Sequence, residues 1–132
     1  MPRRRPGRLR RQTAPFLTDG RELGLPGGTA QALERLGEPG LDPVTVAVDL
    51  QVWRELVGLP RATLSAPHND WAELVGPGVR AVLADAVQAL DRRDGAPLRA
   101  ELARLDALFE RKTSPNPLAD PTLPWWSRRW SH

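Results

Sequence analysis

The sequence predicts a mainly α-helical fold, a small helical domain built on an antiparallel helical hairpin over residues 77–112. Two runs of apolar side chains at helical spacing indicate this hairpin. The first run comprises Val79, Val82, Leu83, Ala86, Val87 and Leu90, and the second comprises Leu98, Leu102, Leu105 and Phe109. Between the runs, Gly95 suits the left-handed position after a helix, and Pro97 suits the first turn of the next one. We therefore expect the chain to reverse near Gly95.

A short helix is expected over residues 30–36, before the hairpin. Thr29 is its candidate N-cap, because a Thr hydroxyl can accept a hydrogen bond from the first helical turn. The spacing directs Leu33 and Leu36 inward, and Gly37 suits the end of the helix.

A longer helix is expected to begin after Asp42, whose carboxylate suits the N-cap, with Pro43 at the first helical position. Apolar residues at helical spacing continue to Val57, and Gly58 ends the pattern. Residues 44–48 are also mostly β-branched and alternate as in a strand. The alternative is therefore an α+β fold with a short strand at 44–48.

The hairpin needs a cover, because burial of about ten apolar side chains does not offset the entropy lost on ordering both helices. The helix after Pro43, which carries Trp53, is one candidate cover. A second copy of the hairpin, forming a dimeric four-helix bundle, is the other.

The remaining segments complete the expected domain organisation. Residues 1–14 lack apolar periodicity and are expected to be a disordered basic arm, followed by a single helical domain over 15–112. Within that domain, 61–67 is expected to be a connector. The tail, 113–132, is Pro/Trp-rich, and its four prolines in ten residues predict an extended chain.

Positive charge is concentrated in the arm, while the rest of the chain has 13 basic and 16 acidic residues. Arginines in the arm can neutralise nucleic acid phosphates. A solubilising tail, or a start codon assigned too early in a GC-rich gene, explains the same composition. The candidate nucleic-acid-binding residues are Arg3, Arg4, Arg5, Arg8, Arg10 and Arg11.

Three of the five tryptophans lie in the last eight residues, interleaved with two arginines. Exposed Trp rings are costly in water and favoured at interfaces, so these rings should be docked. The tail is a strap on the chain's own helices or a docking peptide for another protein, and contact with a membrane surface or with stacked nucleic acid bases is the remaining alternative. The candidate partner-binding residues are Trp125, Trp126, Arg128, Arg129 and Trp130.

Signals for chemistry are weak, so no catalytic, cofactor-binding or metal-binding residues are expected. The chain has no cysteine and two histidines, His68 and His132. Asp70 and Glu73 have the spacing of a helix capping box, which explains them better than a metal site with His68 does. The glycine-rich residues 24–29 lack the Lys and the preceding strand of a phosphate-binding loop.

These observations favour a small bacterial-type protein that is not an enzyme. It would be a protein–protein interaction or regulatory module that uses the hairpin face and the Trp-rich tail, and self-association is one form of this. The alternative is a nucleic-acid-associated protein that binds phosphates through its arm. No apolar run reaches the length of about 20 residues that a membrane span requires, and a cytoplasmic location is expected.

Overall fold

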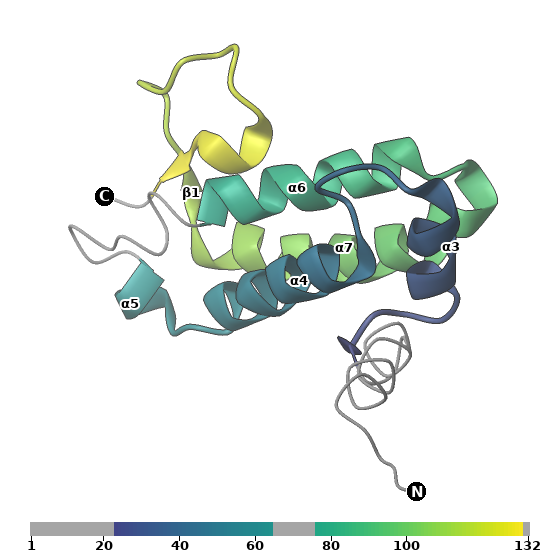
Figure 1. Cartoon of the computed structure of the whole chain (residues 1–132). Coiled ribbons are helices and arrows are strands. Elements are labelled where there is room, and N and C mark those ends of the chain that lie inside the picture. Colours follow the sequence, from purple (N-terminus) through teal and green to yellow (C-terminus); the bar gives the residue numbers. More distant parts are fainter. Residues whose placement is uncertain (1–22, 65–75, 131–132) are drawn as a thin grey trace, which may run out of the picture.

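The computed structural model describes residues 23–64 and 76–130, with only the backbone of Trp130 (Figure 1). The predicted mainly helical fold is confirmed. The helices are α3 (Thr29–Leu36), α4 (Pro43–Val57), α5 (Arg61–Leu64), α6 (Gly76–Ala89) and α7 (Arg92–Lys112). They are followed by the two-residue strand β1 (Ser114–Pro115), the 3-10 turn η2 (Trp125–Ser127) and the strand β2 (Arg129–Trp130).

Several predictions concern residues that lie outside these ranges. They are the basic arm over 1–14 with its six arginines, the group of His68, Asp70 and Glu73, and His132. The expected connector over 61–67 is described only as far as Leu64. Its first four residues form the helical turn α5.

The start of α4 follows the prediction. The Asp42 carboxylate accepts hydrogen bonds from the backbone N–H of Thr45 at 3.0 Å and from the Thr45 hydroxyl at 2.8 Å. Pro43 is the first helical residue, and Gly58 is the C-cap. The alternative strand at 44–48 is wrong, because Val46 is fully buried whereas Val48 is 55% exposed, as a helix requires.

The start of α3 differs from the prediction. Gly28 is the N-cap, in the left-handed region at φ 81°, and makes no side-chain capping bond. Thr29 is instead a buried residue of the helix itself, and its hydroxyl has no hydrogen-bond partner. Leu33 is buried as expected, but Leu36 is exposed. Gly37, at φ 64°, ends the helix as predicted.

The expected reversal at Gly95 is also wrong. The N-cap of α7 is Asp91, whose carboxylate accepts the backbone N–H of Asp94 at 2.7 Å. Gly95 is a buried residue inside α7, where an added Cβ would lie 3.4 Å from the side chain of Leu90 and 3.4 Å from the carbonyl oxygen of Val87. Pro97 is likewise inside the helix.

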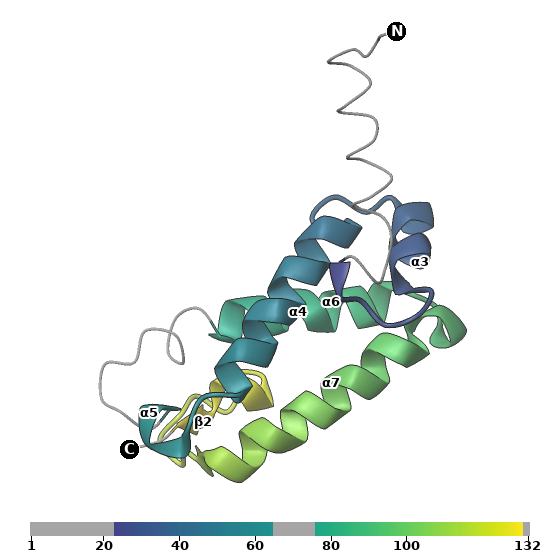
Figure 2. The ribbon, with the colours of Figure 1, turned by 90° about the horizontal axis from the view of Figure 1, so that it is seen from below.

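The helices predicted over 77–112 form, but α6 packs more extensively on α4 than on α7. Figure 2 shows α6 and α7 diverging from their shared turn, with α4 crossing α6. The unit of packing is therefore a three-helix arrangement of α4, α6 and α7, with α3 against one end, rather than a self-contained hairpin.

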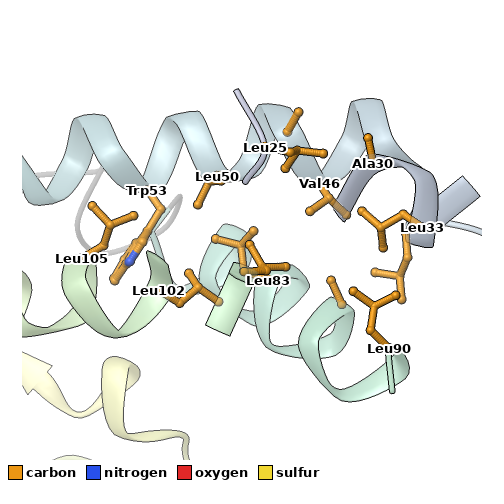
Figure 3. Packing of buried hydrophobic residues seen from close by; sticks show 14 of the residues in the cluster. Leu25, Ala30, Leu33, Val46, Leu50, Trp53, Leu83, Leu90, Leu102 and Leu105 are labelled. Carbon is orange, nitrogen blue, oxygen red and sulfur yellow. The ribbon is translucent and has the colours of Figure 1, made fainter. Parts of the chain in front are cut away.

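One hydrophobic core joins these helices (Figure 3). Val46 and Leu50 of α4 meet Leu83 of α6, and all three are fully buried. Trp53 is 1% exposed, and its ring centroid lies 5.0 Å from that of Phe109 in α7. Helix α4, which carries Trp53, thus packs on α6 and α7, as the first of the two alternatives predicted.

The tail after α7 is a closed loop, whereas an extended chain was expected. Ser114 pairs with Trp130 and Pro115 pairs with Arg129 in an antiparallel ladder. The Arg129 guanidinium also donates to the carbonyl oxygens of Glu110 and Thr113, at 3.1 and 3.0 Å. We call residues 114–130 the C-terminal loop. Figure 1 shows it projecting from the helices beside α6.

Candidate functional site

The site is built around a charged network that connects three helices. The Asp106 carboxylate of α7 accepts two hydrogen bonds from the Arg80 guanidinium of α6, from Nε at 3.0 Å and from Nη2 at 2.8 Å. The same carboxylate accepts the indole N–H of Trp53 in α4 at 3.1 Å. The side chains of Arg80 and Asp106 are only 9% and 14% exposed. This network therefore fixes α4, α6 and α7 relative to one another.

Sequence reasoning missed this network, although each partner carried a weak signal. Arg80 lies three residues before the buried Leu83, and Asp106 lies four residues after the buried Leu102. Both charges therefore occupy inward faces of their helices. The buried face of α6 is rotated slightly from the predicted face, since Val79 is only half-buried while Arg80 is buried.

The C-terminal loop covers one side of the network. The ring of Trp126 lies 4.5 Å from the Arg80 guanidinium carbon, within the range of a cation–π contact. Trp125 packs edge-on to Trp126 at 5.9 Å and against Phe109 at 6.3 Å. Three buried donors of Arg80 and the loop remain without an acceptor, namely Arg80 Nη1, Trp126 Nε1 and Arg128 Nε. Such unpaired groups carry a desolvation cost in the closed loop.

An open groove of about 520 Å³ runs beside this network between α6 and α7. On both helices, the residues that line the groove recur every three or four positions, as expected for one face of a helix. The apolar lining residues are Ala84, Val87, Leu102 and Ala103. The polar ones are Gln88 and Arg99, with Arg80, Asp106 and Trp126 making up the rest of the lining.

The charge in this groove is positive. Arg80 and Asp106 neutralise each other in their ion pair. Arg99 is exposed, and among the described residues it has no carboxylate partner. The groove therefore offers one uncompensated cation beside an apolar floor, which suits a ligand that is apolar and acidic.

The opposite side of α7 carries a second link to α4. Glu101 accepts hydrogen bonds from the Arg104 guanidinium, at 2.9 and 3.1 Å, and from Arg54 Nε at 3.1 Å. The hydrogen bonds from Arg104 contribute most to holding the pKa of the Glu101 carboxyl below its ordinary value of 4.5, and the bond from Arg54 lowers it further. This carboxylate is a structural link and does not line the groove.

The predicted partner-binding residues are only partly gathered at the groove. Trp126 lines it, and Trp125 packs beside Trp126 on the chain's own helices. Arg129 binds the end of α7, and Arg128 borders a smaller hollow of about 310 Å³ between α7 and the C-terminal loop. That these side chains contact another protein stays a prediction, and the side chain of Trp130 lies outside the description.

Within residues 23–64 and 76–130, no group of three or more His, Cys, Asp or Glu side chains is arranged to hold a metal ion. None of the helices in this part of the chain has both the length and the apolar composition needed to cross a bilayer. No protein-family model, curated protein or solved structure is significantly similar to the chain.

Proposed function

We propose that the chain is a non-enzymatic protein-interaction module whose α6–α7 groove binds a short segment of a partner polypeptide. The observation that carries this proposal is the groove itself. It combines an apolar floor, an uncompensated Arg99 and the ring of Trp126, and it lies where the two predicted interaction elements meet.

Size and composition support a polypeptide ligand. A volume of about 520 Å³ lies within the range of pockets that hold small molecules and cofactors, roughly 300 to 1,000 Å³, so the groove has room for a few side chains of a bound segment. An open groove between two helices suits the apolar face of a helix or an extended segment. The half-buried Val87 and the Trp126 ring would contact its apolar side chains, and Arg99 would pair with a carboxylate at the rim.

The test is a selection of random peptides on the full chain, followed by affinity measurement on two variants. Ala103→Trp places a large ring in the groove, because Ala103 is exposed and lines it. Ala100→Trp is the matched control, since Ala100 is exposed on the same helix and does not line the groove.

The proposal expects selected peptides to lose binding to Ala103→Trp, by about tenfold or more, and to keep binding to Ala100→Trp. Peptides that bind both variants as well as the original chain would place the interaction elsewhere. The absence of any selected peptide would also count against the groove.

The charge distribution supports a second candidate function, nucleic acid binding through the arm. The described residues contain twelve basic and twelve acidic side chains, so any attraction to phosphates depends on the six arginines before Gln12. Six phosphate contacts would give log K a slope near −5 against log salt, at about −0.9 per contact. Anisotropy of a labelled duplex tests this, comparing the full chain with one that begins at Thr13. Equal affinities for the two would refute it.

A further inference from the structure

The tip of the C-terminal loop presents apolar side chains to solvent. Leu118 is 92% exposed and Leu123 is 41% exposed, whereas most other large apolar residues in the described part of the chain are buried. An exposed leucine is not unusual alone, but these two lie on one short projecting loop with Asp120 between them.

This tip is held in a defined conformation. The N–H of Leu118 donates to the Asn116 side chain at 2.9 Å, and the N–H of Thr122 donates to the Asp120 carboxylate at 2.9 Å. The β1–β2 ladder closes the base of the loop. Little ordering entropy therefore remains to be lost when the tip binds, and such preorganisation favours docking.

The tip and the groove are complementary in charge and polarity. Asp120 is the single charged residue between Thr113 and Ser127, so the tip is acidic and apolar. The groove has an apolar floor and an uncompensated Arg99. The loop leaves its own groove at Trp126 and projects away from the helices, so the tip of the same copy points away from that groove (Figure 1).

We propose that the occupant of the groove is the C-terminal loop tip of a second copy of this chain, with Leu118 on the apolar floor and Asp120 at Arg99. The inference rests on the proposed function and names its partner. Reciprocal exchange of two tips gives a closed two-fold dimer in which each copy supplies one tip and one groove. So small an interface belongs to the weak, transient class.

The first test is the concentration dependence of the mass of the full chain, by sedimentation equilibrium from about 5 µM to about 1 mM, the range of weak complexes. We expect a reversible monomer–dimer equilibrium. Leu118→Asp should raise the dissociation constant about tenfold or more, because a charge replaces the apolar anchor. Val48→Asp is the control, since Val48 is also an exposed apolar residue, at 55%, and lies on α4 away from the groove.

The second test is a double-mutant cycle on the pair of Arg99 and Asp120. Asp120→Asn removes the charge and keeps a side-chain oxygen that can accept the N–H of Thr122. Arg99→Gln and Asp120→Asn should each weaken the dimer several-fold, and the double variant should be about as weak as either single because the same pair is lost in all three. Arg93→Gln controls for net charge, since Arg93 is exposed on α7 outside the groove. Circular dichroism confirms that each variant is folded. Non-additive losses in the double variant are the result that a general loss of stability would not produce.

A chain that stays monomeric at 1 mM overturns the inference. So does a dimer that is insensitive to Leu118→Asp, or a double variant whose loss of affinity is the sum of the losses in its singles. The proposed function fails separately. If the chain is monomeric but selected peptides lose their binding to the Ala103→Trp variant, the groove binds a segment of another protein. In that case only the self-association proposal fails.

Discussion

The network of Trp53, Arg80 and Asp106 allows the strongest prediction about stability. Asp106→Leu removes the carboxylate and leaves the Arg80 guanidinium buried, with only the Trp126 ring against it. The Trp53 indole N–H loses its acceptor as well. Removing one partner of a buried pair typically costs about 3 to 5 kcal/mol, because the other charge remains uncompensated.

A loss of this size is a large fraction of the stability of a small domain, which is about 5 to 15 kcal/mol. At roughly 4 to 8 °C per kcal/mol for a domain of this size, it lowers the Tm by on the order of 15 °C or more. Arg80→Met should cost a similar amount, since Asp106 then keeps only the bond from Trp53. The double variant removes both charges, and its cost should fall below the sum of the two singles by about 2 kcal/mol or more.

Urea unfolding followed by circular dichroism at 222 nm measures all four proteins without relying on Trp fluorescence, which these changes perturb directly. Unchanged m-values would show that the same surface unfolds in each. A cost below about 1 kcal/mol for Asp106→Leu, or additive effects in the double variant, would refute the role of the network in fixing the three helices.

Three further predictions concern the helices. Because the pKa of Glu101 is lowered on folding, the ionised carboxylate stabilises the fold above pH 4.5, and this stabilisation is lost as the pH falls through the folded pKa. Urea midpoints measured during acid titration should therefore fall less below pH 4.5 in Glu101→Gln than in the original chain. Asp42→Ala should cost about 1 kcal/mol by loss of the α4 cap, and Asp42→Asn much less; equal costs for the two would contradict the capping role. Gly95→Ala should be neutral or stabilise by up to about 1 kcal/mol, because Gly95 is helical, the nearest atom at 3.3 Å is the end of the exposed Arg99 side chain, which can move, and the next atoms lie at 3.4 Å. Gly37→Ala, at positive φ, should instead destabilise by about 1 kcal/mol; the reverse order in thermal melts would contradict both assignments.

The sequence predicted best those helices that begin and end at capping residues adjacent to them in the chain. The α4 helix is the best example, since Asp42 and Pro43 begin it and Gly58 ends it. The α6–α7 turn shows the limit. The sequence predicted a boundary at Gly95, whereas Asp91 caps α7 and Gly95 packs inside the helix against Val87 and Leu90, a contact that no local pattern reveals.

The candidate site was predicted less well than the fold. The sequence indicated that Trp125 and Trp126 should be docked, and both lie on the chain's own helices. It did not predict that Trp126 would stack on Arg80, because their contact spans 46 positions and depends on the return of the C-terminal loop. The prolines suggested an extended tail, but Asx turns at Asn116 and Asp120 fold it back.

The most direct test of the central claim is a map of amide chemical shifts in the full chain, with and without a peptide selected on it. The groove account predicts that the largest changes fall on residues 84–88 and 99–106 and on the indole N–H of Trp126, a buried donor that has no acceptor here. Changes confined to the outer face of α4, around Val44 and Val48, would contradict the account and place the interaction on a different surface.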